Sequence, residues 1–392
     1  MQPFQRKIKG YEITEFTGGT KFRNGDTLLA RITPCLENGK TAQVTILDIN
    51  EIGFGSTEFI VLREKEGVTF NDFIYYLSIS PEIRNICIKS MTGTSGRQRA
   101  QIDVIKNTTI LLPPLEEQKE IANILSSLDE KIETNNQINK KLEKMAQAIF
   151  KQWFVDFEFP NENGEPYKSS GGEMVESELG VIPIGWEIKQ LTDLAEFQNG
   201  YAFYKEGYSD SGIKVIDLVN VDILGNFIET SRDKYISYEL YNQNKLIKYR
   251  LNKDDLIIIM TDRTQEMNIL GKTAKVPYSN RYILNQRVGR IRVYDGVNEN
   301  YLLSYMNSPE ILEELKRKSL GTVQRYFNTN HVKELKFVIP SRRMMGKYSK
   351  IINPIYNKML NNDEEINGLK SLRDKLLPKL MSGELRVPQS KL

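Results

Sequence analysis

An apolar stripe at helical spacing runs through residues 115–153, LEEQKEIANILSSLDEKIETNNQINKKLEKMAQAIFKQW. Its apolar positions follow one another in steps of three and four residues, which is typical of a coiled-coil seam. Pro113 and Pro114 precede the stretch and permit a helix start. We therefore predict one helix of about 40 residues, roughly 60 Å long at 1.5 Å per residue. The stripe positions are Leu125, Leu128, Ile132, Leu142, Met145, Ile149 and Trp153.

A second stretch repeats this stripe about 227 residues later, after Ser341, which is expected to cap its helix. A stripe this long needs a partner, so we expect the two helices to pack against each other, antiparallel, with Asn135 and Asn362 in the seam setting the register. The alternative is that each helix packs only on its own globular domain. The second set of stripe positions is Ile352, Ile355, Met359, Leu369, Leu372, Leu376 and Leu380.

The segments before the two helices also match each other. Gly25–Ala30 (GDTLLA) returns as Lys253–Ile258 (KDDLII), Gly39–Val44 as Gly271–Val276, and residues 89–114 as residues 318–340. Four blocks in one order, with a period near 228 residues, predict a duplicated, pseudo-twofold molecule. Short β-branched and aromatic runs broken by Gly, Asn and Asp predict mixed α/β (α+β) domains. Helices are expected near residues 72–85 and 299–319.

We expect five successive segments. About 40 residues of the second domain, beginning near Trp186, have no counterpart in the first, so the first domain is expected to be shortened at its N-terminus. The segments are a first globular domain at 1–112, a first long helix at 113–157, a linker at 158–182, a second globular domain at 183–340, and a second long helix with a C-terminal tail at 341–392.

The composition restricts the function. The chain has 392 residues, of which 40% are hydrophobic and 27% charged, as in soluble globular proteins. One histidine and two cysteines are too few for a zinc site built from these residues. No apolar stretch is long enough for a bilayer or a secretory signal, so a cytoplasmic protein is expected. The net charge is +3, but residues 156–178 carry seven acidic residues and one lysine, which leaves a basic remainder that permits nucleic-acid binding.

Motifs for catalysis are weak. The Gly-Lys-Thr tripeptides at 39–41 and 271–273 lack the earlier glycine of a phosphate-binding loop, and are interpreted as turns entering strands. Glu187-Ile188-Lys189 and Glu334-Leu335-Lys336 have a spacing used by Mg²⁺-dependent nucleases, but such triplets are common in a chain this charged. A dinucleotide-type glycine fingerprint is absent.

Basic turns are more informative, because arginine and lysine neutralise phosphates and arginine and glutamine can bond two groups on a base edge. One turn surrounds residues 92–96, and its repeat mate lies near Gly321 and Thr322. Arg31 and Arg263 occupy turns that correspond roughly, and three arginines follow on a neighbouring strand. The candidate DNA-binding residues are Arg31, Lys89, Arg97, Gln98, Arg99, Arg263, Arg287, Arg290, Lys318, Gln324 and Arg325.

The whole pattern resembles the specificity subunits of type I restriction–modification systems. Residues 25–34 (GDTLLARITP), 92–99 and 112–118 (LPPLEEQ) look like the first half of that family. Residues 153–157 (WFVDF), 182–186 (IPIGW) and 377–385 (LPKLMSGEL) look like its junctions. The resemblance covers nearly the whole chain.

This resemblance implies a non-catalytic subunit in which each globular domain reads half of a bipartite double-stranded DNA target. The paired helices would set the gap and dock two methylation subunits, and motor and nuclease subunits would join the complex. S-adenosylmethionine, ATP and Mg²⁺ would belong to those partners, and this chain would bind no cofactor. Two alternatives stay open: a self-contained nuclease or methyltransferase, and a coiled-coil scaffold with incidental basic turns.

Overall fold

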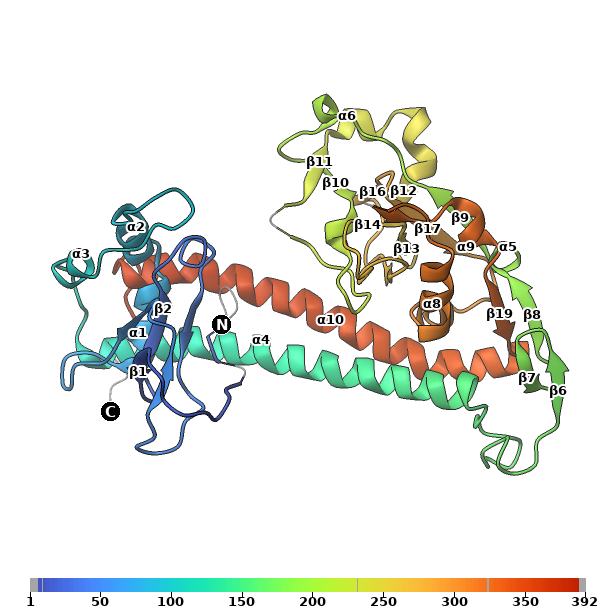
Figure 1. Ribbon diagram of the computed structural model, residues 1–392, viewed down its shortest axis with the longest axis horizontal. Coiled ribbons are helices and arrows are strands. Elements are labelled where there is room, and N and C mark those ends of the chain that lie inside the picture. The colour runs from blue at the N-terminus through green and yellow to red at the C-terminus, as the bar shows by residue number, and fades with distance from the viewer. Residues whose placement is uncertain (1–5, 9, 231, 323, 388–392) are drawn as a thin grey trace. The chain divides into compact units, whose positions relative to one another are not determined.

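The computed structural model describes residues 6–8, 10–230, 232–322 and 324–387 (Figure 1). The chain forms two compact units, residues 1–138 with 361–392 and residues 139–360. Each unit holds one globular domain together with adjoining parts of two long helices, α4 (Leu115–Phe150) and α10 (Arg342–Met381). The division between the units therefore falls inside both helices.

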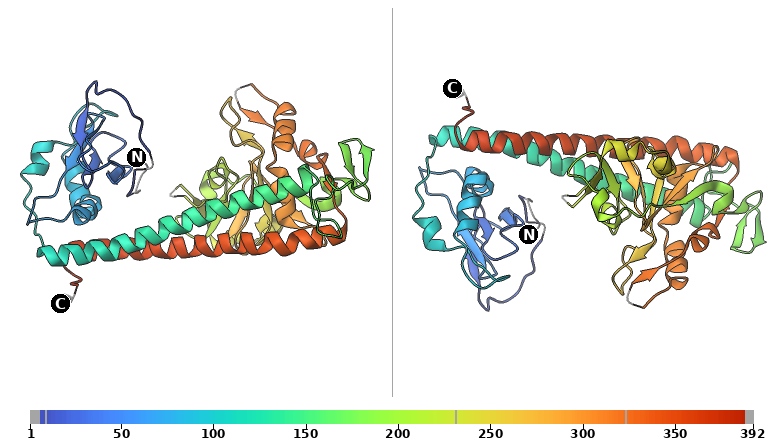
Figure 2. Two further views of the ribbon diagram at one scale, coloured as in Figure 1. Left: turned by 90° about the horizontal axis from the view of Figure 1, so that it is seen from below. Right: turned by 90° about the horizontal axis from the view of Figure 1, so that it is seen from above.

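The two long helices pair antiparallel, as predicted. In the first unit, Leu125 of α4 shares a core cluster with Leu377 and Leu380 near the end of α10. In the second unit, Phe150 at the end of α4 packs with Ile352 near the start of α10. Figure 2 shows the two helices side by side in both of its views. Within the described residues, no helix is apolar over enough of its length to cross a membrane.

The buried seam is narrower than the predicted stripe. Leu125, Ile352 and Leu380 are at most 2% exposed, whereas Met145 and Leu372 are 53% and 46% exposed. The last two residues were assigned to the seam by spacing alone, and they lie outside it because a straight α-helix drifts against a repeat of 3.5 residues.

Asn135 and Asn362 are both buried. The Asn135 side-chain amide donates a hydrogen bond to Glu365 Oε2 of α10 at 2.8 Å. One turn further along α4, in the second unit, the amide of Asn139 donates to the backbone oxygen of Met359 at 3.3 Å. These two hydrogen bonds link specific residues of α4 and α10. The role of Asn135 and Asn362 in setting the register stays a prediction.

Replacing Asn135 with alanine is expected to lower the free energy of unfolding by about 1–2 kcal/mol, because it removes a partly buried hydrogen bond between a buried amide and Glu365. Asn136 is the next residue of the same helix and is exposed, so Asn136→Ala serves as the matched control. Both changes raise helix propensity equally, and their difference therefore isolates the hydrogen bond. Urea unfolding followed by circular dichroism at 222 nm measures both variants, and equal midpoints would contradict the prediction.

Local structure marks the start of α10 and the end of α4. Ser341 Oγ accepts a hydrogen bond from the Met344 amide at 3.3 Å, so the predicted cap of α10 is confirmed. After Phe150, α4 passes into a π-helical turn, η1 (Lys151–Val155), in which the Asp156 amide donates to Lys151 O at 2.8 Å. The wider turn places Trp153 and Phe154 in the core of the second unit. The long helix was predicted to continue to residue 157.

The first globular domain is built on an antiparallel sheet of strand order β3-β2-β5, with α1 packed against β2 and β3. A separate antiparallel pair joins β1 to β4. Phe73, Tyr75 and Tyr76 of α1 also pack against α4 and α10. The elements are β1 (Thr20–Phe22), β2 (Thr27–Ala30), β3 (Thr41–Gln43), β4 (Gly53–Gly55), β5 (Phe59–Leu62), α1 (Asn71–Ile79), α2 (Pro81–Lys89) and α3 (Ile102–Lys106).

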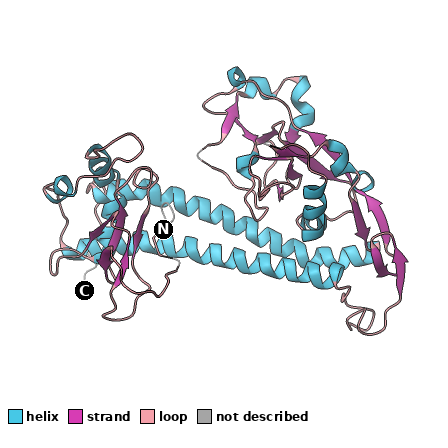
Figure 3. Ribbon diagram, viewed as in Figure 1, coloured by secondary structure: helices cyan, strands magenta, loops and turns pink. Residues whose placement is uncertain are grey.

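The second globular domain repeats this plan with additional strands (Figure 3). Its main sheet has the order β15-β13-β17-β9, and a second sheet has the order β11-β10-β16-β12. Only the pair of β10 and β16 is parallel among the described strands. The elements are β6 (Met174–Ser177), β7 (Gly180–Pro183), β8 (Glu187–Gln190), α5 (Leu191–Leu194), β9 (Ala195–Asn199), β10 (Ile213–Ile216), β11 (Lys234–Ile236), α6 (Tyr238–Tyr241), β12 (Arg250–Leu251), β13 (Leu256–Ile259), β14 (Thr261–Asp262), β15 (Thr273–Lys275), β16 (Tyr282–Leu284), β17 (Val288–Val293), α7 (Glu299–Met306), α8 (Pro309–Arg317), β18 (Arg325–Tyr326), α9 (Thr329–Lys333) and β19 (Lys336–Ile339).

The central strand of the second domain is buried on both faces. Leu256 and Ile258 of β13 pack with α7 and α8, whereas Ile257 and Ile259 pack with residues of the second sheet. Alternate side chains of a strand point to opposite faces, so four successive apolar residues require cover on both sides. The predicted mixed α+β class is confirmed, and the sheets are mainly antiparallel.

The duplication holds at the level of strand register. The β1–β4 pair aligns Lys21 with Phe54, and the β12–β16 pair aligns Arg250 with Ile283, which are the same positions shifted by 229 residues (250 − 21 = 229). Arg63 donates to Asp26 from Nε and Nη2, one edge of its guanidinium, at 2.7 Å each, and Arg292 donates to Asp255 in the same way. The predicted pairing of Gly25 with Lys253 is therefore one residue out of register.

The structure adds detail to the predicted segments. The regions expected to be helical each contain two helices, α1 with α2 and α7 with α8, because Pro81 and Pro309 start a new helix after the N-caps Ser80 and Ser308. The expected linker contains the hairpin of β6 and β7. Its Phe159 stacks on Trp186 at 5.0 Å, so this segment is folded onto the second unit.

The first domain differs from the second at one sheet edge. Strand β17 pairs with both β13 and β9, whereas β5, its counterpart, pairs only with β2 among the described strands. The described part of the first domain thus contains no counterpart of β9.

Candidate nucleic-acid interface

A two-stranded ribbon brings the basic turn of the second unit together. Strand β14 pairs with β18 so that Thr261 lies opposite Tyr326 and Asp262 opposite Arg325. Asp262 is buried and accepts hydrogen bonds from the amides of Thr264 and Ile269 at 2.8 and 2.9 Å. Burial raises the pKa of Asp262, but these hydrogen bonds outweigh it and hold the pKa below its ordinary value. A charged Asp262 therefore anchors the loop that follows β14.

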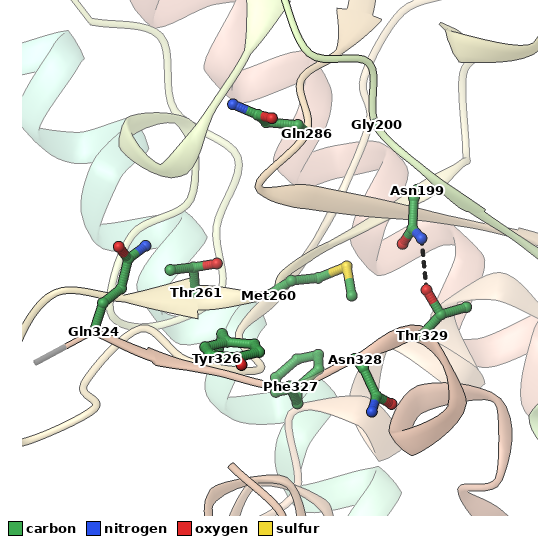
Figure 4. A pocket seen from close by; sticks show the side chains of 10 residues that line it. All are labelled: Asn199, Gly200, Met260, Thr261, Gln286, Gln324, Tyr326, Phe327, Asn328 and Thr329. Atoms are coloured by element: carbon green, nitrogen blue, oxygen red, sulfur yellow. Dashed lines mark hydrogen bonds between the residues drawn. The ribbon is translucent and has the colours of Figure 1, made fainter. Parts of the chain in front are cut away.

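An open hollow of about 620 Å³ lies beside this ribbon (Figure 4). Its lining carries no charged side chain, and it combines amides and hydroxyls with two aromatic rings and the side chain of Met260. Asn199 at the end of β9 donates a hydrogen bond to Thr329 Oγ1, which closes one side of the hollow. The lining residues are Asn199, Gly200, Met260, Thr261, Gln286, Gln324, Tyr326, Phe327, Asn328 and Thr329.

Arginines adjoin this lining in the sequence. Arg325 follows Gln324, it is half-buried, and its Nε atom is buried without a hydrogen-bond partner. Arg287 follows Gln286 and is half-buried, and Arg263 follows β14 and is exposed. Amides, aromatic rings and flanking arginines are the groups that recognise base edges and phosphates. Lys318, by contrast, is paired with Glu314 Oε1 at 2.6 Å one turn earlier.

In the first unit, the basic turn at residues 89–99 closes through the bridge of Thr92 with Arg99. Lys89 and Arg97 are exposed, and Gln98 is half-buried. Arg99 donates two hydrogen bonds to Glu58 Oε1, from Nε at 2.9 Å and from Nη2 at 2.7 Å. The hydrogen bond from Arg99 holds the pKa of Glu58 below its ordinary value, so this carboxylate is charged. Two predicted DNA-binding residues, Arg31 and Arg99, thus share one acidic partner, with Arg31 Nε 3.8 Å from Glu58 Oε2.

One candidate residue is corrected. Arg290 of β17 is 2% exposed and does not reach the surface. Its Nη1 donates to the backbone oxygens of Lys248 and Arg250 at 3.0 and 3.3 Å, and its Nη2 donates to Glu196 Oε1 at 2.9 Å. Its side chain points into the fold, because β17 is covered on both faces, and it holds the strand against the segment before β13. Arg290 is a structural residue.

A second correction concerns the correspondence between Arg31 and Arg263. The Ala100 amide donates to Arg31 O in the first unit, and the Phe327 amide donates to Met260 O in the second. Arg31 therefore corresponds to Met260, and the residue that corresponds to Arg263 is Pro34. The two basic turns share these backbone hydrogen bonds but not their charged side chains.

Comparison with known proteins gives the family. A family model described as the Type I restriction modification DNA specificity domain matches residues 4–144 and 183–371, well over half of the chain. The chain belongs to this family. The matched ranges contain both globular domains and most of both long helices.

Related proteins agree with this result. The chain is 28% identical to the Type I restriction enzyme MjaIX specificity subunit of Methanocaldococcus jannaschii, across 83% of this chain and 71% of the relative. It is also 28% identical to the Type I restriction enzyme HindI specificity subunit of Haemophilus influenzae, across 93% and 87%. The crystal structure of the Type-I restriction-modification system S subunit from M. genitalium has the same fold, with a TM-score of 0.52 and 16% identity across 97% of this chain and 88% of that chain.

A specificity subunit of a type I system is its non-catalytic component, and catalysis lies in other subunits. The alternative of a self-contained nuclease or methyltransferase is therefore wrong. Consistent with this, both Gly-Lys-Thr tripeptides form turns before strands, with Gly39 and Gly271 at φ of 76° and 80°. The lysines have no phosphate-binding loop around them.

Several residues that line the hollow of this specificity subunit were not among the predicted DNA-binding residues. Asn199 and Gln286 escaped notice because they are single uncharged residues at the ends of strand segments, where a polar side chain following a buried run could have indicated a site. Tyr326 and Thr329 lay beside the predicted basic turn but were not selected. Glu58 also was not predicted. An alignment of the two halves with an offset of 229 residues would have indicated it, because that offset places Glu58 opposite Arg287.

Proposed function

We propose that this chain recognises a bipartite double-stranded DNA sequence, with each globular domain reading one half-site. The proposal is supported most by the hollow of the second unit, whose lining is uncharged, rich in amides and adjoined by arginines, in a chain of the DNA specificity family. Uncharged polar groups in such a place can read base edges, whereas neighbouring arginines can bind phosphates. Family membership favours this reading over a coiled-coil scaffold.

We further propose that the paired helices α4 and α10 set the number of base pairs between the half-sites and dock two methylation subunits. Motor and nuclease subunits would complete the assembly. S-adenosylmethionine, ATP and Mg²⁺ would bind to these partners and not to this chain. The exposed faces of two helices of 36 and 40 residues are long enough to serve both the domains and the partners.

Selection from a randomised duplex library with the purified chain tests this function. We expect two enriched blocks of sequence separated by a gap of fixed length and unspecified sequence. Enrichment of one block only would contradict the bipartite target, and no enrichment above a scrambled duplex at several salt concentrations would contradict sequence recognition altogether. Affinities must be compared at stated salt, because phosphate contacts make them salt-dependent.

Replacing Arg325 with alanine is expected to weaken binding to the selected duplex by about 1–3 kcal/mol and to relax the preference at one position of one half-site. The reason is that Arg325 stands in the sequence between Gln324 and Tyr326, two residues of the lining, and a guanidinium can donate two hydrogen bonds to one base. Arg317 is exposed on α8 and is absent from the lining, so Arg317→Ala removes the same charge as a matched control. Fluorescence anisotropy with a panel of single-base variants of the target measures both. An identical loss for every duplex in the panel would place Arg325 on a phosphate instead.

A further inference from the structure

The cluster around Glu58 in the first domain occupies the position that the hollow occupies in the second. The Arg31 amide donates to Glu58 O at 3.0 Å, and the Met260 amide donates to Arg287 O at 3.1 Å. Thr92 bridges Arg99 in the first domain, as Leu320 bridges Tyr326 in the second. Glu58 therefore corresponds to Arg287, and Arg99 corresponds to Tyr326.

The side chains at these equivalent positions differ in kind. The first domain has two arginines and a glutamate, whereas the second has Met260, Tyr326 and Arg287 beside a lining of amides. Glu58, Arg31 and Arg99 together carry one net positive charge. Their side chains are 27%, 26% and 42% exposed, so this cluster is accessible from solvent.

Glu58 binds one edge of the Arg99 guanidinium and leaves another edge available. It accepts from Nε and from Nη2, and the Nη1 atom makes a longer contact of 3.4 Å with Arg97 O. A guanidinium has five N–H donors in a rigid plane, so fixing the Nε edge also fixes the direction of the Nη1 and Nη2 end. Arginine reads guanine by donating two hydrogen bonds to O6 and N7. An arginine already held in one orientation loses less conformational entropy when it makes those bonds.

We infer that Glu58 is a positioning residue that holds Arg99 as a reader of guanine, so that the two domains recognise different bases at equivalent positions of their folds. This inference rests on the proposed function. At the equivalent place of the second domain, amides such as Gln324 are available instead, and a glutamine pairs with adenine. We therefore expect one guanine of the first half-site whose recognition depends on Glu58, and no such guanine in the second half-site.

A simpler role for Glu58 makes a different prediction. If Glu58 only neutralised the two arginines, its removal would expose positive charge and strengthen binding to every duplex alike, with a steeper salt dependence. If Glu58 positions Arg99, its removal lowers the preference for one base pair. The two roles therefore differ in which quantity changes, the overall affinity or the selectivity.

The test compares Glu58→Gln with the unchanged chain on the library-selected duplex and on variants with each base pair replaced. We expect the preference for guanine at one position of one half-site to fall about tenfold or more, while the preferences in the other half-site stay unchanged. Glu66 is exposed in the same domain, so Glu66→Gln is a control for the loss of one negative charge. Arg99→Lys keeps the charge but not the planar donor set, and it is expected to lose the same preference.

Two outcomes would overturn the inference. One is a uniform gain in affinity for Glu58→Gln with an unaltered preference profile. The other, which applies even if Glu58→Gln fails to fold, is a folded Arg99→Lys variant that keeps the full guanine preference. In either case the library would still yield its two-part sequence, so the proposed function would stand, whereas a library without any enriched sequence would remove the proposed function itself.

Discussion

Phe154→Ala is expected to lower the free energy of unfolding of the second unit by about 3–5 kcal/mol. Phe154 is 4% exposed and lies in the π-helical turn after α4. Its ring meets the rings of Tyr301 and Tyr348 edge to face, with centroids 4.7 and 4.8 Å apart. It also lies against Phe150 and Trp186, with centroids 5.4 and 5.8 Å apart. Truncation leaves a cavity among large side chains that cannot all move into it.

Tryptophan fluorescence measures this effect directly. The chain has two tryptophans, Trp153 and Trp186, and both belong to the same core cluster as Phe154. Their emission during urea unfolding therefore reports on the second unit alone. Val155 is the next residue of the same turn and is 42% exposed, so Val155→Ala is the matched control, with an expected loss below about 1 kcal/mol. Equal losses for the two variants would show that the aromatic cluster contributes little to stability.

Arg290→Ala is expected to cost about 3–5 kcal/mol of unfolding free energy without removing a DNA contact, because two backbone oxygens lose hydrogen bonds from a charged donor. The substitution leaves the Lys248 and Arg250 backbone oxygens without their buried donor and Glu196 without its cation. Burial and the neighbouring Arg292 lower the pKa of Arg290, although Glu196 and Asp255 oppose this change. Arg290 is thus held inside the fold mainly by its hydrogen bonds to two backbone oxygens, whereas Glu196 is 50% exposed and can be solvated once the guanidinium is removed.

Arg287 provides the contrast within the same segment of chain. It is half-buried three residues earlier, beside the lining of the hollow, so Arg287→Ala is expected to weaken duplex binding with a stability loss below about 1 kcal/mol. Arg290→Ala is expected to lower stability but to leave duplex binding unchanged, when binding is measured at a temperature where the variant is folded. Urea unfolding by tryptophan fluorescence and anisotropy titration with the selected duplex measure the two quantities. Loss of duplex affinity in a fully folded Arg290→Ala variant would refute its assignment as a structural residue.

The long helices and the duplication were predictable from the sequence for a local reason. Their signals are repeated spacings, such as Leu125 with Ile352, and spacing is set by the helical period whatever surrounds the helix. A stripe longer than one domain can cover also requires a partner, and the chain contains one matching stripe. The mixed α+β class followed from short apolar runs such as Leu256–Ile259, whose neighbours along the chain are turn residues.

The candidate interface was only partly predictable. Gln324 and Arg325 were predicted because a basic turn with glutamine is visible in the sequence; Gln324 lines the hollow, and Arg325 follows it on β18. The hollow itself unites residues from β9, the β16–β17 turn and the β14–β18 ribbon, which are separated by up to 130 positions (329 − 199 = 130). No sequence pattern indicates that these distant segments lie next to one another in the fold.

By itself, the sequence determined the paired helices, the internal repeat and the family, because each depends on order and period along the chain. Only the tertiary structure decided what each arginine does. Arg290, Arg99 and Arg325 are the same amino acid, yet one is buried against backbone oxygens, one is held by Glu58 and one has a buried Nε atom without a hydrogen-bond partner. The charge of an arginine is the same everywhere, but its burial and its partners come from segments distant in the chain, and these decide whether that charge can meet DNA.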